Sequence, residues 1–224
     1  MPFHGQWDPP ADEVIFRNYF PDKTNGFFIE CGAADGVTHS CCLFFEERGW
    51  MGINIEPSEP AFERLVRNRP GSTNIQVGLG NFDHRKSTFI VAVKDGYGGG
   101  CIEWHPRFKQ EVLAEGYSFE NCEIEVMTYG TLVLKYGVPH VDLLVLDVDG
   151  YELKVIEGMP LTQPCPDVIC AEYPLVGLEN LKSALSELGY RFDFVSFNNA
   201  YFSIPERISP KPGGWFGVTD LYPY

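Results

Sequence analysis

Short apolar runs alternate with amphipathic segments along most of the chain, which predicts strands and helices in turn. Apolar runs that end in small or acidic residues predict strands within 26–36, 50–57, 75–77, 141–150 and 167–173. One-sided apolar patterns predict helices over 10–20, 39–49, 61–68, 127–136, 153–157 and 178–188. The run 143–146 is apolar on both faces, as expected for a buried central parallel strand.

This order of elements predicts an α/β fold with a doubly wound, mostly parallel sheet and helices on both faces. Residues 87–93 add another extended run, whereas 105–120 shows no clear pattern beyond a short helix. Residues 191–204 predict a hairpin with its turn at Asn198–Asn199, which would add an antiparallel strand at one edge. We expect one domain over 1–224, with an N-terminal helical segment at 1–24 and an irregular C-terminal arm at 205–224.

The charge balance narrows the possible partners. The chain has 224 residues and a formal net charge of −14, and its 17 basic residues form no run. Nucleic acids and anionic membranes are therefore disfavoured as partners. No apolar run approaches the roughly 20 residues that span a bilayer, and residues 1–13 lack a signal-peptide pattern. Seven cysteines without a Cys-x-x-Cys pair fit reduced thiols, so we expect a cytoplasmic protein, with homo-oligomers left open.

Acidic residues follow four of the predicted strands. In parallel sheets the carboxyl ends of the strands meet at one edge, where ligands bind. The acids expected to gather there are Glu30 and Asp35 after the first strand, Glu56 after the second, Asp147 and Asp149 after the fourth, and Glu172 after the fifth.

The first strand leads into a glycine turn in which Gly32 and Gly36 are separated by three residues. A dinucleotide fingerprint would read G-x-G-x-x-G, and carboxylates beside a pyrophosphate would be repulsive. Acids beside a ligand that carries an amine and a sulfonium are attractive, so the pattern favours a cationic nucleoside. Glu56 follows Gly32 at about the ~20-residue spacing at which an acid meets ribose hydroxyls.

The segments FFIECGAADGVTHS, LFFEERGWMGINIEPSEPAFERLVRNRP, HVDLLVLDVDGYELKVIEGM and DVICAEY resemble the FkbM family of S-adenosylmethionine-dependent methyltransferases. The resemblance keeps the family's order and spacing over roughly residues 12–204. It implies a Rossmann-like class I methyltransferase fold, S-adenosylmethionine as the cofactor, and O-methylation of a small molecule or sugar. N-methylation of a small-molecule acceptor is the alternative for the reaction.

The resemblance also implies a cofactor site. Glu30, Gly32, Ala33, Asp35 and Gly36 would cradle the methionine part and the ribose. Ser40 would cap the next helix and face the cofactor, and Glu56 would hold the ribose. The remaining implied contacts are Pro57, Gly80 and Asn81 around the adenine, and Asp147 near the transferred methyl group. The chain departs from the family at Asp149, where many relatives carry Glu, and at Cys41-Cys42, where relatives often carry polar residues.

A hydroxyl acceptor needs a general base as its proton leaves. We favour Asp147 or Asp149, and His39 is a further candidate. Asp147, Asp149 and Glu172 could instead bind Mg²⁺ or Ca²⁺, an alternative that we do not favour. The Gly96–Gly100 segment, with Tyr97, Trp104, His105 and Phe108, is a candidate lid over the acceptor. Two other classes stay open: a non-catalytic nucleoside-binding module, and an NAD-dependent oxidoreductase, which the glycine spacing disfavours.

Overall fold

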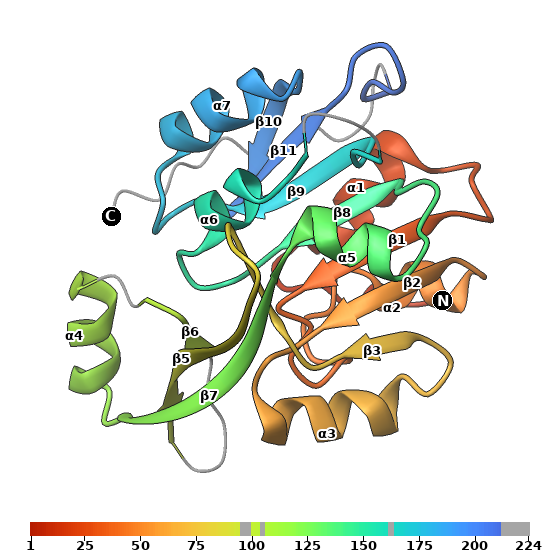
Figure 1. The fold of residues 1–224 in the computed structure, drawn as a ribbon. Helices are drawn as coiled ribbons and strands as arrows, with labels where there is room; N and C mark the ends of the chain where they lie inside the picture. The colour runs from red at the N-terminus through yellow and green to blue at the C-terminus, as the bar shows by residue number, and fades with distance from the viewer. Residues whose placement is uncertain (95–99, 104–105, 161–163, 212–224) are drawn as a thin grey trace.

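The computed structural model describes residues 1–94, 100–103, 106–160 and 164–211. Its main sheet has seven strands in the order β10-β11-β9-β8-β1-β2-β3 (Figure 1). The strands are β1 (Phe27–Cys31), β2 (Met51–Ile55), β3 (Thr73–Ile75), β8 (Leu143–Leu146), β9 (Val168–Glu172), β10 (Arg191–Ser196) and β11 (Asn199–Ser203).

The five strands β3, β2, β1, β8 and β9 are parallel, and the order reverses between the neighbours β1 and β8. Such a switch point leaves a crevice at the carboxyl ends of the strands. The strands at the centre are buried on both faces, as the apolar run Leu143–Leu146 predicted. The sheet therefore brings the ends of β1, β2 and β8 to a common ligand-binding edge.

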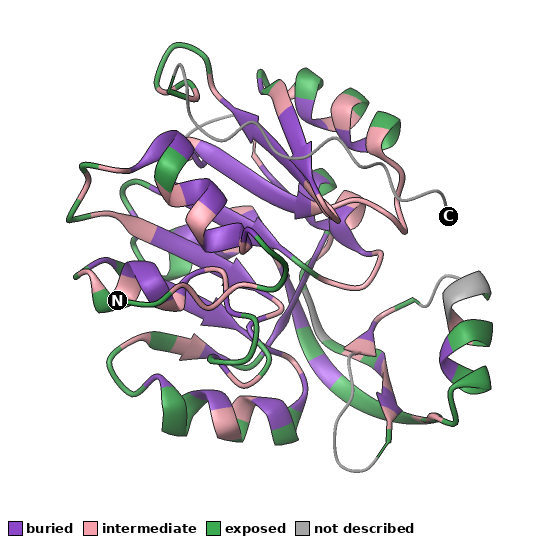
Figure 2. Cartoon of the chain, turned by 180° about the vertical axis from the view of Figure 1, so that it is seen from behind, coloured by how far each residue is buried: buried purple, intermediate pink, exposed green. Residues whose placement is uncertain are grey.

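Helices cover both faces of this sheet. One apolar core joins α5 (Tyr129–Lys135), α6 (Glu152–Glu157) and α7 (Leu178–Glu187) to one face, and a second joins α1 (Ala11–Tyr19) and α2 (Leu43–Glu47) to the other. Figure 2 shows the buried strands between these layers. Helix α3 (Glu59–Asn68) packs beside β3 at the edge. The predicted doubly wound α/β fold is confirmed.

A second, four-stranded sheet in the order β4-β7-β5-β6 was not predicted. It contains β4 (Gly78–Gly80), β5 (His84–Val93), β6 (Gly100–Cys101) and β7 (Ser118–Thr128), and α4 (Pro106–Ala114) precedes β7. Figure 1 shows this sheet and α4 beside the main sheet. The strands β5 and β7 pair over most of their lengths, so each supplies the other's backbone hydrogen bonds.

Several predicted boundaries are corrected. The predicted strand at 75–77 ends at Ile75, and the helix predicted over 127–136 begins only at Tyr129, because Met127 and Thr128 end β7. The helix predicted over 39–49 is reduced to α2. The C-terminal hairpin forms one edge of the sheet, as predicted: β11 pairs antiparallel with β9, and β10 is the outermost strand.

The N-terminal segment and the described start of the C-terminal arm pack against this framework. Within 1–24 the helix is α1, and residues 4 and 5 are held by hydrogen bonds to the buried Asp12. The C-terminal arm is described to Lys211, whose backbone N–H donates to the carbonyl of Asn18 at 2.9 Å. None of the helices in the described ranges combines the length and the apolar character that crossing a bilayer requires.

Candidate functional site

A cavity of ≈ 320 Å³ lies at the carboxyl ends of β1, β2 and β8. This is within the usual range for small-molecule sites. Ten of the residues that the sequence singled out line it: Glu30, Gly32, Ala33, Asp35, His39, Ser40, Glu56, Pro57, Asp147 and Asp149. The structure therefore gathers most of the predicted site, although the roles of these residues remain predictions.

The turn after β1 requires glycine at position 32. Gly32 has φ +87°, and a Cβ there would lie 1.8 Å from the carbonyl oxygen of Asp147. The N–H groups of Gly32 and Ala33 donate to the carbonyl of Ile55 at 3.1 and 3.0 Å. The turn is thus folded onto the end of β2 and pressed against the end of β8, so the floor of the cavity is formed by closely packed backbone.

Glu56 is fixed at the end of β2 by two backbone donors. Its Oε2 accepts from Ala34 N–H at 3.0 Å, and its Oε1 accepts from Ser58 N–H at 2.8 Å. The side chain is 8% exposed, and burial raises its pKa to about 7. A carboxylate has about four acceptor positions, so two remain for hydroxyl groups of a ligand.

Glu30 lines the cavity and also connects β1 to the loop before α2 and to Arg69. Its carboxylate accepts from Ser40 Oγ at 3.0 Å and from Cys41 N–H at 2.7 Å, and Arg69 Nη1 lies 3.6 Å from Oε2. Ser40 Oγ in turn accepts from Leu43 N–H at 3.0 Å, at the start of α2. Burial raises the pKa of Glu30, and Arg69 partly offsets this effect. Glu30 therefore has a structural role whether or not it also contacts a ligand.

Asp35 and His39 lie in the loop between β1 and α2. Asp35 accepts hydrogen bonds from the backbone of Val37 and Thr38 at 2.9 and 2.7 Å. Burial acts to raise its pKa, but these hydrogen bonds prevail and the pKa is lowered. His39 is exposed, with φ 59°, and its charge would lower the pKa of Asp147. The loop thus places an ionised carboxylate and an imidazole on the cavity wall.

The ends of β8 and β9 bring three carboxyl groups together. Asp147, Asp149 and Glu172 each have a carboxylate oxygen within 4.8 Å of the others. Burial, followed by repulsion from Asp147, raises the pKa of Asp149 to about 8 and that of Glu172 to about 9. Burial also raises the pKa of Asp147. This cluster holds protons near neutral pH, so it can accept or donate one where it faces a ligand.

Glu152 stabilises the loop that carries two acids of this cluster. It is 1% exposed, and its Oε1 accepts from the N–H groups of Val148 and Gly150 at 3.0 and 3.3 Å. It therefore fixes the loop that carries Asp147 and Asp149. Glu152 is the last residue of the spacing D-x-D-G-x-E, and this spacing is the signal in the sequence that could have identified it.

The second sheet supplies a wall that sequence reasoning missed. Phe89 of β5, Cys101 of β6, Ile102 and Tyr151 line the cavity. The backbone N–H of Gly100 hydrogen-bonds to the carboxylate of Asp149, which ties β6 to the loop after β8. No local pattern identifies this wall, because it depends on pairing between distant strands.

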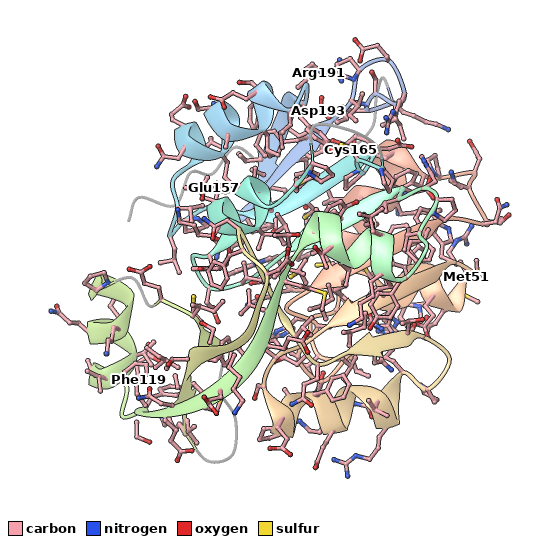
Figure 3. The ribbon with its side chains drawn as sticks, viewed as in Figure 1. Met51, Phe119, Glu157, Cys165, Arg191 and Asp193 are labelled. Carbon is pink, nitrogen blue, oxygen red and sulfur yellow. The ribbon has the colours of Figure 1, made fainter. Side chains whose placement is uncertain are left out.

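Three residues of the predicted site are not brought to the cavity wall. Gly36 (φ +78°) instead allows α3 to pack closely, since a Cβ there would lie 2.7 Å from Arg69 Cγ. Gly80 is buried in β4, and Asn81 donates to Glu157 Oε2 at 2.7 Å. Figure 3 labels Glu157 on α6. Residues 77–79 line the cavity in their place.

A second acidic cluster contains His140, Asp142 and Asp167. Lys23 pairs with Asp142, and Arg207 Nη1 lies 3.1 Å from Asp167 Oδ1. These cations neutralise the cluster, so it does not call for a metal ion. It adjoins the amino ends of β8 and β9, away from the cavity.

Part of the candidate lid lies outside the described residues: Tyr97 and the rest of 95–99, with Trp104 and His105. The same holds for 212–224 of the C-terminal arm. Of the predicted lid segment, Gly100 lines the cavity. The described walls alone present five acidic side chains, from Glu30, Asp35, Glu56, Asp147 and the mostly protonated Asp149, against Arg64 and His39. This balance suits a cationic ligand with hydroxyl groups.

Comparisons with known proteins show the family of the chain. The family model for the methyltransferase FkbM domain matches residues 30–192, well over half of the chain. No curated protein sequence matches it. Among solved structures, a TehB-like SAM-dependent methyltransferase from Corynebacterium glutamicum aligns with TM-score 0.46 and 10% identity, over 86% of each chain. A precorrin-6y C5,15-methyltransferase from Geobacter metallireducens aligns with TM-score 0.44 and 11% identity, over 90% of this chain and 86% of that one.

Proposed function

The chain belongs to the family of methyltransferase FkbM domains and is a methyltransferase that uses S-adenosylmethionine, and we propose that it methylates a hydroxyl group of a small molecule or sugar. The observation that supports this most is the cavity at the switch point. There Glu56 and the Gly32 turn adjoin the cluster of Asp147 and Asp149. The first pair of features would bind the cofactor, and the acidic cluster would bind the hydroxyl acceptor beside it.

The residues present fit the cofactor. Glu56 has two acceptor positions free of backbone donors for the ribose hydroxyls. The Gly32 turn has no side chain that would fill the floor of the cavity. The excess of carboxylates on the wall attracts the sulfonium and amine charges and would repel the pyrophosphate of a dinucleotide.

When bound, S-adenosylmethionine would supply an activated methyl group, which passes from the sulfonium sulfur to the hydroxyl oxygen and leaves S-adenosylhomocysteine. The protein has to orient the hydroxyl and take its proton. Asp147 is accessible from the cavity, and its raised pKa makes its carboxylate a stronger base than an ordinary aspartate. In the proposed reaction, a carboxylate oxygen of Asp147 accepts the hydroxyl proton.

Asp149 and Glu172 assist this step. Because their pKa values are raised to about 8 and about 9, they are mostly protonated near pH 7 and can donate hydrogen bonds to acceptor oxygens. Asp149 is also held by Gly100, so it is fixed on the side of the second sheet. His39, in the loop before α2, also lines the cavity and is the second candidate base.

The test is methyl transfer from labelled S-adenosylmethionine to a panel of sugars, simple alcohols, phenols and amines. We expect labelled methyl ethers with a hydroxyl acceptor. Asp147→Asn should lower turnover about a hundredfold or more and leave S-adenosylhomocysteine affinity within a few-fold. The exposed Glu179→Gln on α7 is the matched control. Products methylated only on nitrogen would refute the hydroxyl assignment, and wild-type turnover by Asp147→Asn would refute the base.

A further inference from the structure

Two aromatic side chains from opposite ends of the chain stack beside the site. Trp7 belongs to the N-terminal segment, and Phe197 belongs to the turn between β10 and β11. Their ring centroids are 5.3 Å apart with an interplanar angle of 9°. Trp7 is still 36% exposed, so part of this residue stays open to solvent. A stacked pair that is left open in this way can receive a further ring.

The N-terminal segment is anchored so that Trp7 adjoins the cavity. The buried carboxylate of Asp12 accepts from the N–H groups of His4 and Gly5 at 2.7 and 3.1 Å. Gly5 also forms a backbone bridge with His39, which lines the cavity. The next residue, Gln6, lines the cavity itself. Trp7 is therefore the next residue along the chain after one that lines the cavity.

The turn that carries Phe197 is fixed to the acidic cluster. Asn198 Nδ2 donates to Glu172 Oε1 at 3.4 Å, and the carbonyl of Asn198 accepts from Tyr173 N–H at 3.0 Å. Glu172 in turn lies within 4.8 Å of Asp147 and Asp149, measured between carboxylate oxygens. The aromatic pair is thus joined to the cavity from both sides.

The backbone supports the same grouping. In the described part of the chain, five residues other than glycine have positive φ. Three of them, Ala34, His39 and Asp149, line the cavity, and the other two are Trp7 (φ 80°) and Phe197 (φ 51°). Left-handed backbone is costly for large side chains and gathers at ligand sites. The pair therefore shares the backbone signature of the site.

We infer that Trp7, supported by Phe197, is a platform for the acceptor, and that the acceptor is a hydroxylated ring without negative charge. This rests on the proposed function. The apolar face of such a ring would stack on the indole, while its hydroxyl groups reach the carboxyl groups of Asp147, Asp149 and Glu172. A carboxylate or phosphate on the ring would be repelled by the ionised carboxylate of Asp147, whereas an amine would be attracted by it and by the aromatic faces.

The test uses three pyranoses of the same ring size: glucose, glucosamine and glucuronate. Each is titrated into protein saturated with S-adenosylhomocysteine, and binding is followed by ligand-observed NMR. We expect glucose and glucosamine to bind, and glucuronate to bind at least about tenfold more weakly. Trp7→Ala should weaken glucose and glucosamine about tenfold, and Trp7→Phe should retain most of the affinity.

The control is Met51→Ala, because Met51 is an exposed apolar residue at the start of β2, labelled in Figure 3. It should leave all affinities unchanged, and S-adenosylhomocysteine should bind all variants equally. Three results would overturn the inference: equal binding of glucuronate, unchanged sugar binding in Trp7→Ala, or no sugar binding at all. Failure of the wild type to bind S-adenosylhomocysteine would instead overturn the proposed function.

Discussion

Replacement of Glu56 tests whether this residue binds the ribose of the cofactor. In Glu56→Ala the acceptors for the two ribose hydroxyls are lost together. A hydrogen bond to a charged group contributes about 1.5–3 kcal/mol. Taking the lower value for both hydroxyls gives a loss of about 3 kcal/mol, which corresponds to a Kd for S-adenosylhomocysteine raised about a hundredfold or more.

Glu56→Gln should lie between the wild type and Glu56→Ala. The glutamine oxygen can accept from either Ala34 N–H or Ser58 N–H, but its amide group would face the other donor. One hydroxyl therefore keeps an acceptor while one backbone N–H loses its partner. We expect a Kd raised about tenfold.

The assay is calorimetric titration with S-adenosylhomocysteine, accompanied by thermal unfolding to show that the variants are folded. Glu63→Ala is the matched control, because Glu63 is an exposed acid on α3 that contacts only Arg67 among the ion pairs described, at 3.9 Å. A Kd for Glu56→Ala within threefold of the wild type would refute the ribose role. An equal loss in Glu63→Ala would show that the effect is only one of net charge.

Three further predictions concern the turn, the acids and metal dependence. Gly32→Ala should destabilise the protein by about 2 kcal/mol or more in denaturant unfolding, because its Cβ would overlap the Asp147 carbonyl. Gly137→Ala (φ +62°, with open space around the Cβ) should cost only about 1 kcal/mol, and equal losses would refute the clash. Turnover should rise with pH while Asp147 ionises and fall again between about pH 8 and 9, where Asp149 (pKa about 8) and Glu172 (pKa about 9) lose the protons that they donate to the acceptor. A flat profile would contradict this. EDTA should change turnover less than twofold because protons neutralise the cluster, and a loss restored by Mg²⁺ would show that a cation does so instead.

The sequence predicted the parts of the site that are local to one strand and its following turn. Glu56 and Asp147 follow apolar runs, and the parallel order of those runs brings their ends together. Gly32 was identified from spacing, and its close approach to the Asp147 carbonyl gives the physical reason. These features depend on short-range pattern and on the geometry of parallel sheets, which the sequence carries directly.

The second sheet could not be predicted in this way. β7 alternates apolar and acidic residues only in its second half, where Cys122, Ile124 and Val126 alternate with Glu123 and Glu125, and its first half is mostly exposed. This short alternation does not show which strand β7 pairs with. The stability of β7 comes from pairing with β5, which is a contact between distant segments. For this reason Phe89 and Ile102, which line the cavity, were missed. The predicted adenine contacts Gly80 and Asn81 directly follow Gly78 and Leu79 of the cavity wall, and their role stays a prediction.

The Trp7–Phe197 stack could not be predicted from the sequence for a related reason. Neither residue belongs to a periodic pattern, and the two meet only because the N-terminal segment crosses to the last hairpin. A single sequence does not show which distant segments pack against each other.

The central claim is that the cavity at the ends of β1, β2 and β8 binds S-adenosylmethionine. The most direct test is calorimetric titration of the purified protein with S-adenosylhomocysteine, with NAD⁺ as the control. The account predicts binding of S-adenosylhomocysteine at micromolar Kd and no heat from NAD⁺, because the acidic wall repels a pyrophosphate. No binding of S-adenosylhomocysteine, or binding that Glu56→Ala leaves unchanged, would contradict it.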